Sequence, residues 1–185
     1  MTLKDILKLV CEFVNEKEIV SKWENNESLT TKQSEKVGRM VKCFNLVNQE
    51  IASDFLPFLF EEAVNVTNGV LSYSTLTKNV INIYQLKDSL GRSLEFRNFP
   101  NYVEVKGVAK KVIYSFLPDE LGLNDNVPTA RGLTARVYAY GVACEYLLLE
   151  GFGSDAEIWE ERFKESLFVL SRKRGEHRLP KRRFI

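Results

Sequence analysis

The hydrophobic period changes twice along this chain of 185 residues, and that change limits the possible folds more than any other feature. Apolar residues recur every three or four positions from residue 3 to 55, and again from 129 to 170. Between residues 61 and 117 they alternate with polar ones. The first pattern is typical of amphipathic helices, and the second is typical of half-buried strands. Several short strands with no helix between them favour antiparallel pairing.

We therefore predict an α+β fold, in which a helical bundle carries an inserted small antiparallel β-sandwich or barrel. Two N-terminal and two C-terminal helices would form the bundle from residues 1–60 and 129–174. Residues 61–117 would form the β subdomain and residues 118–128 a loop. Residues 175–185 would be an extended basic C-terminal docking tail.

Four helices are expected from the apolar stripes and their caps. The first runs from Leu3 to Val20, with Thr2 accepting a hydrogen bond from the Asp5 N–H, and the second runs from Thr31 to Phe55. Thr129 or a neighbour caps the third, which Gly151-Phe152-Gly153 ends. A capping box over Ser154–Glu157 opens the fourth. The fourth helix should turn five residues inward, namely Ile158, Trp159, Phe163, Leu167 and Leu170.

The central block contains a strong hairpin signal, since both residues of Asn68-Gly69 tolerate a positive φ. Ala63–Thr67 and Val70–Tyr73 would be the two strands of this hairpin. Further strands are expected over four runs, which are Val80–Leu86, Ser93–Phe99, Tyr102–Val105 and Lys111–Phe116.

Composition and cysteine spacing exclude several classes of protein. No apolar run approaches the roughly 20 residues of a membrane helix, and the N-terminus lacks the basic region of a signal peptide. Cys11, Cys43 and Cys144 are far apart and form no CxxC pair, so buried free thiols in a reducing compartment are expected. We expect neither a membrane partner nor a disulfide framework.

Residues that could support catalysis are few. The single histidine, His177, lies in the tail, and no phosphate-binding glycine loop is present. Glu61-Glu62 and Glu160-Glu161 are adjacent pairs whose side chains point apart. Asp119, Glu120 and Asp125 could bind calcium but lack the spacing of an EF-hand. We predict no catalytic residue, no metal site and no cofactor, and hence no enzyme.

Charge is concentrated at the C-terminal end. From Arg172 to Arg183 there are seven basic residues against one acid, whereas the rest of the chain has an excess of acids. Such an asymmetry suggests that the tail contacts a partner. Basic and apolar residues are mixed in the predicted partner-binding site, which comprises Leu179, Pro180, Lys181, Arg182, Arg183, Phe184 and Ile185. Phosphate binding by the basic residues and a solvated tail are the alternatives.

The order of elements resembles that of phage head-tail connector proteins, also called adaptor or head-completion proteins. Three stretches carry the resemblance. The N-terminal helices lead through Ile51–Phe55 into the β block, Tyr138–Tyr146 is followed by Glu150-Gly151, and Ala156–Leu167 is followed by Leu179–Phe184. The similarity is one of element order and composition over nearly the whole chain.

This resemblance implies a structural protein of the virion neck, made in the host cytoplasm. Copies would form a ring, commonly twelve-fold, which docks on the portal protein and contacts tail or neck proteins. Genomic DNA would pass through the lumen without sequence-specific binding. A tail terminator, a minor capsid protein, a DNA-binding accessory protein and an unrecognised enzyme remain as alternatives.

Overall fold

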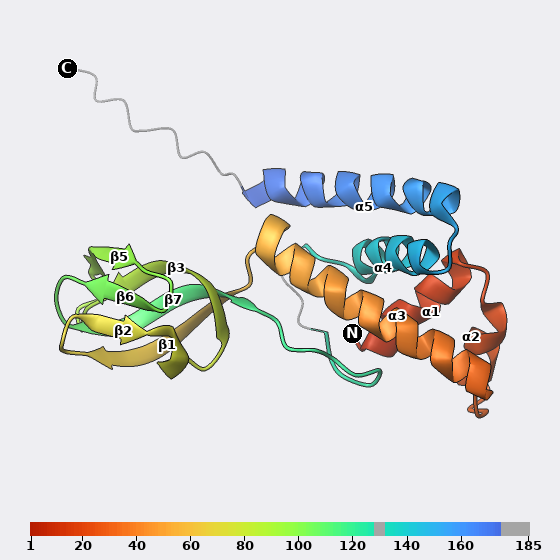
Figure 1. The fold of residues 1–185 in the computed structure, drawn as a ribbon, viewed down its shortest axis with the longest axis horizontal. Coiled ribbons are helices and arrows are strands. Elements are labelled where there is room, and N and C mark those ends of the chain that lie inside the picture. The colour runs from red at the N-terminus through yellow and green to blue at the C-terminus, as the bar shows by residue number, and fades with distance from the viewer. Residues whose placement is uncertain (128–131, 175–185) are drawn as a thin grey trace, which may run out of the picture. The chain divides into compact units, whose positions relative to one another are not determined.

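The computed structural model describes residues 1–127 and 132–174 and has a mixed α+β fold (Figure 1). These residues form five α-helices and two antiparallel sheets, as the coarse prediction requires. The chain divides into two compact units. Of the described residues, unit 1 holds Met1–Phe44 and those from Leu121 onward, and unit 2 holds Asn45–Glu120.

Helix α1 (Leu3–Phe13) begins at the predicted capping box. The Thr2 hydroxyl accepts from the Asp5 N–H at 3.2 Å, and the Asp5 carboxylate accepts from the Thr2 N–H at 2.9 Å. These hydrogen bonds lower the pKa of Asp5. Two further N–H groups of the first turn donate to the loop of unit 1, from Leu3 to the Asp125 carbonyl and from Lys4 to the Leu123 carbonyl. The start of α1 is therefore fully capped.

The prediction that this first helix continues to Val20 is wrong. Helix α1 ends at Phe13, and a separate helix, α2 (Lys17–Glu24), follows. Asn15 has a φ of 60°, and the Glu16 N–H donates to the Cys11 carbonyl at 2.7 Å. This is a Schellman turn, with asparagine in the left-handed position that usually requires glycine. Residues 15–18 are all polar, so the apolar stripe is interrupted where α1 ends.

Helix α3 (Thr31–Glu50) continues into η1 (Ile51–Phe55), a single π-helical turn, so the predicted span is confirmed. The Leu56 N–H donates to the Ile51 carbonyl at 2.7 Å, which closes the wider turn. Leu56 is extended because Pro57 follows it. The buried residues at 3–4 spacing include Met40, Cys43, Phe44, Val47 and Ile51.

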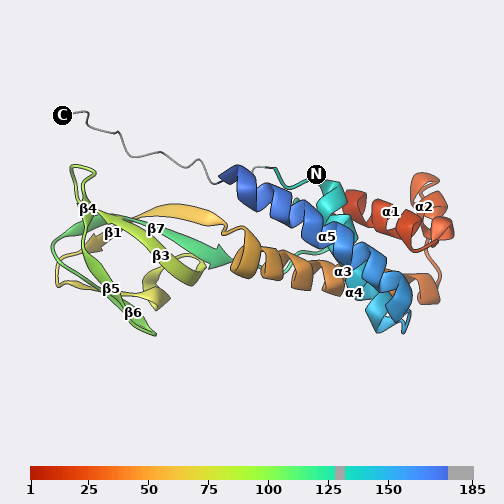
Figure 2. The ribbon, with the colours of Figure 1, turned by 90° about the horizontal axis from the view of Figure 1, so that it is seen from above.

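Helix α4 (Ala135–Leu149) is the most apolar helix and is buried on several sides. It packs against both α1 and α5 (Gly153–Arg174), and Figures 1 and 2 show α5 lying along it. The Phe13 ring of α1 stacks on Trp159 of α5 and on Tyr140 of α4, with centroids 4.5 and 5.6 Å apart. Helix α4 begins after Thr134, and the alternative cap, Thr129, lies outside the described residues.

Only three residues, Glu150–Phe152, separate α4 from α5. Gly151 has a φ of 85°, and the Phe152 N–H donates to the Leu147 carbonyl at 2.9 Å, which is again a Schellman turn. The Phe152 carbonyl accepts from the Ala156 N–H, so Phe152 is the residue that directly precedes α5. The predicted capping box is wrong, because α5 begins at Gly153 and Ser154 lies inside its first turn.

The inner face of α5 matches the prediction in all but one position. Phe163 and Leu167 are buried, and Trp159 and Leu170 are half-buried. Ile158 was predicted to face inward, but 54% of it is exposed. Ile158 stands five positions before Phe163, so the two side chains point about 140° apart around the helix.

Unit 2 contains two antiparallel sheets that share one core. Four strands form the first sheet in the order β1-β7-β3-β4, which are Leu59–Val66, Ala109–Leu117, Asn79–Lys87 and Ser93–Leu94. Three strands form the second in the order β2-β6-β5, which are Val70–Ser72, Tyr102–Val105 and Phe96–Asn98. The core includes Leu86, Val103, Val112 and Tyr114, all fully buried.

The predicted hairpin across Asn68-Gly69 is wrong. A turn does form there, with Gly69 at a φ of 76°, but β1 pairs with β7 and β2 pairs with β6. The Gly69 carbonyl accepts from the Val105 N–H at 2.8 Å, which ties the turn to β6. The turn thus carries the chain from one sheet to the other. The predicted strand Ser93–Phe99 likewise divides at Glu95 into β4 and β5, one in each sheet.

Truncating Leu167 to alanine should lower the free energy of unfolding by about 2–4 kcal/mol, because this fully buried side chain leaves a cavity. Its neighbour Phe168 is 56% exposed, so Phe168→Ala should change the same quantity by less than about 1 kcal/mol. Urea unfolding at low protein concentration compares the two variants. Equal losses would contradict the assigned inner face of α5.

Candidate functional site

The docking residues predicted from the sequence lie outside the described residues, as does His177. This applies to the whole set Leu179, Pro180, Lys181, Arg182, Arg183, Phe184 and Ile185. Candidate sites in the described part of the chain are three groups of titratable residues, one pocket and three exposed surfaces.

Two of the acidic residues considered as calcium ligands accept hydrogen bonds from other groups of the chain. Asp119 accepts a hydrogen bond from the Lys78 ammonium at 2.7 Å, and Asp125 accepts from the Gly122 N–H at 2.7 Å. Within residues 1–127 and 132–174, no group of three His, Cys, Asp or Glu side chains could hold a metal ion.

Glu61 and Glu62 point to opposite faces of β1, as adjacent residues of a strand must. Glu61 pairs with Lys111 at 2.9 Å, and this bond lowers the pKa of Glu61. Glu62 instead accepts from the Tyr114 hydroxyl at 2.9 Å, and that hydroxyl accepts from the Lys78 N–H. Burial raises the pKa of Tyr114 to about 12. These bonds link β1 and β7 with the residue that precedes β3, and they bring no two carboxylates into one site.

All three cysteines are buried free thiols, as predicted. Burial raises the pKa of Cys11 to about 12 and that of Cys43 to about 11. Both thiols therefore stay protonated at neutral pH, and the nucleophilic form is the thiolate. Cys11 donates to the Met40 sulfur across the core between α1 and α3. Their role is packing.

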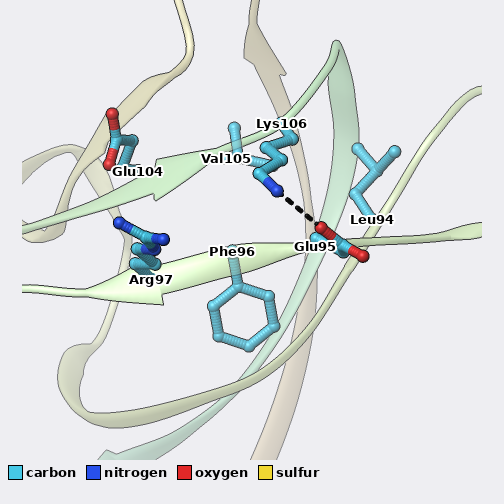
Figure 3. A pocket seen from close by; sticks show the side chains of 7 residues that line it. All are labelled: Leu94, Glu95, Phe96, Arg97, Glu104, Val105 and Lys106. Atoms are coloured by element: carbon cyan, nitrogen blue, oxygen red, sulfur yellow. Dashed lines mark hydrogen bonds and ion pairs between the residues drawn. The ribbon is translucent and has the colours of Figure 1, made fainter.

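A shallow pocket of about 540 Å³ lies beside β5 and β6 (Figure 3). Its lining combines apolar with charged side chains, namely Leu94, Glu95, Phe96, Arg97, Glu104, Val105 and Lys106. Glu95 and Lys106 form an ion pair at 2.8 Å, which lowers the pKa of Glu95 and raises that of Lys106. Arg97 lies opposite Glu104 across the two strands. The balanced charges select neither an anion nor a cation.

The hairpin between β5 and β6 carries an exposed aromatic pair at its tip. The rings of Phe99 and Tyr102 stack with centroids 4.7 Å apart, and 37% and 38% of these residues are exposed. The Phe99 N–H donates to the Tyr102 carbonyl at 2.9 Å, which fixes the turn between them. A rigid aromatic pair of this kind is typical of a contact with another protein. We call it the aromatic tip.

The end of α4 and the following turn carry a second exposed apolar surface. Leu148, Leu149 and Phe152 are 52%, 63% and 56% exposed. Single exposed apolar residues are ordinary, but three within five positions form a patch of the kind that marks an interaction site. We call it the apolar corner. The run Leu147–Leu149 could have revealed this surface in the sequence, because one buried stripe of an amphipathic helix cannot include three consecutive residues.

The third surface is the outer side of α5, where Ile158, Phe168 and Val169 are each at least half exposed.

None of the helices in the described ranges is long and apolar enough to cross a membrane. Comparison with known proteins gives no family model and no curated protein that matches this chain.

Alkaline pH should destabilise the protein through its buried thiols. Cys11 and Cys43 have pKa values raised above 9.0, so their stabilisation is complete below pH 9 and is lost as the pH rises toward about 11–12. Through each of these thiols, raising the pH from 8 to 10 should lower the free energy of unfolding by about 1 kcal/mol. Urea unfolding at the two pH values measures the loss.

The control is the double variant Cys11→Ala, Cys43→Ala. It should lose about 2 kcal/mol less than the wild type over the same interval, since it lacks both titrating groups. An equal loss in the two proteins would mean that other groups cause the alkaline transition.

Proposed function

We propose that this chain is a structural virion protein, a subunit of a head-tail connector ring that docks on the portal and joins the capsid vertex to the tail. Copies of the chain form the ring, commonly a dodecamer, and genomic DNA passes through its lumen without sequence-specific binding. No catalytic step is part of this function. Tail or neck proteins bind on the side away from the portal.

The observation that carries the proposal is that each unit has an exposed apolar surface, and that these surfaces differ. The apolar corner lies in unit 1, and the aromatic tip lies in unit 2. A ring of identical subunits closes through heterologous contacts, so each copy must present two distinct surfaces. A symmetric dimer needs only one. Two distinct surfaces on separate units suit the ring.

The architecture expected from the sequence is also part of the proposal, namely a helical bundle with an inserted β-sandwich. In that arrangement the C-terminal residues Leu179–Ile185 dock on the portal, with Phe184 and Ile185 as apolar anchors. Outside Arg172–Arg183 the sequence has more acidic than basic residues. Like charge weakens the retention of DNA, which suits a subunit that lines a passage.

Electron microscopy of the protein mixed with the cognate portal tests the function directly. A ring of this chain stacked on the portal is expected. No association at high protein concentration would overturn the connector assignment. If the protein instead stays monomeric and binds duplex DNA with a steep salt dependence, it is a DNA-binding accessory protein.

Deletion of Leu179–Ile185 should abolish portal docking and leave the melting temperature within about 2 °C of the wild type, because the described core lies elsewhere. The matched control keeps the chain length and removes only charge, through Lys181→Gln, Arg182→Gln and Arg183→Gln. This control should retain part of the docking if Phe184 and Ile185 anchor the segment. Full docking by the deletion variant would show that the portal contact lies elsewhere.

A further inference from the structure

A stripe of exposed residues follows the outer side of α5 at alternating spacings of three and four. Its members within the described side chains are Asp155, Ile158, Arg162, Glu165 and Val169, and all are exposed. Ile158 and Val169 are 54% and 50% exposed. This spacing keeps the residues on one face, and it is the spacing along which two helices pack side by side.

The stripe is complementary to itself when its direction is reversed. The centre of symmetry lies between residues 163 and 164. A second α5 that runs antiparallel about this point places Ile158 opposite Val169 and Arg162 opposite Glu165. Each pair occurs twice, so the contact has two apolar layers around four opposite charges. The same register sets position 155, an aspartate, level with position 172, an arginine.

The charges at the centre select this direction. In a parallel pair, Arg162 would lie against Arg162 and Glu165 against Glu165, and such like-charge contacts are unfavourable. Within residues 1–127 and 132–171, neither Arg162 nor Glu165 forms an ion pair. Another charged pair on the helix, Glu160 with Lys164, is already joined within the chain. The Arg162 guanidinium lies over the Trp159 ring, 5.1 Å from its centroid, which orients it without neutralising its charge.

We propose that two copies of the chain pair through α5, antiparallel, across a two-fold axis between residues 163 and 164. This pairing goes beyond the connector function, since a ring closed by heterologous contacts does not need it. It is a state of the protein free of the portal. With only two apolar layers the association is weak, as exposed ion pairs add little.

Engineered disulfides test the pairing and its direction. In the full-length double variant Ile158→Cys, Val169→Cys, each new thiol faces the other type on the second copy, and mild oxidation should give a covalent dimer. The two positions are about 16 Å apart along one helix, so no bond can form within a chain. The natural cysteines are buried. A reduced control and an unchanged melting temperature check the fold.

The single variants are the matched controls. Ile158→Cys alone and Val169→Cys alone should each stay monomeric on a denaturing gel, while an equal mixture of the two should cross-link. Dimers of either single variant would indicate a parallel contact and overturn the proposal. Absence of cross-linking in both the double variant and the mixture would also overturn it. Neither outcome bears on portal docking, so this test is independent of the connector function.

Charge reversal gives a second test with a built-in rescue. Glu165→Arg places like charges at both central layers and should weaken self-association by about tenfold or more in sedimentation. Adding Arg162→Glu restores opposite charges and should return association to near the wild-type value. Because both positions are exposed, the fold should be unaffected in either variant. Failure of the double reversal to rescue would exclude the Arg162–Glu165 contact.

Discussion

The burial of α4 is the constraint on which unit 1 depends. Nine of its residues are buried, and they face α1 on one side and α5 on another. A helix this apolar can only be stable when other helices cover it. The three-residue connection Glu150–Phe152 reverses the chain at once, so α5 lies antiparallel on α4. The inner face of α5 then packs on α4, and the outer face of α5 stays exposed.

Features that depend on local sequence were predictable. The Thr2–Asp5 capping box, the span of α3 with η1, and the strands β3 and β6 follow from residues near each other in the chain. Features set by distant residues were not. The turn at Asn68-Gly69 forms, but which strands pair depends on β6 and β7, roughly 35–45 residues later. A turn signal shows where the chain reverses direction, but it does not show which strands the two flanking strands pair with.

The exposed apolar surfaces could not be predicted for a related reason. Apolar residues in a helical pattern were assigned to the core, and Ile158 was placed inward, because sequence gives no direct measure of what covers a face. Phe99 and Tyr102 were read as ends of strands, yet their rings stack on each other at the surface. Whether a side chain is exposed depends on how far the neighbouring elements extend over it. α4 covers one side of α5, and no described residue of unit 1 brings Ile158 and Val169 below half exposure.

Self-pairing through α5 has a consequence for the apolar corner. The antiparallel register sets the start of α5, next to Phe152, level with the end of the α5 of the second copy. Heterologous apolar surfaces on free subunits risk open-ended association, because each contact leaves another surface unsatisfied. A two-fold pair is closed and cannot grow. Under the proposed function the pair would separate before its subunits join a ring. A contact held by two apolar layers and exposed charges is weak, so the proposed assembly on a portal would displace it.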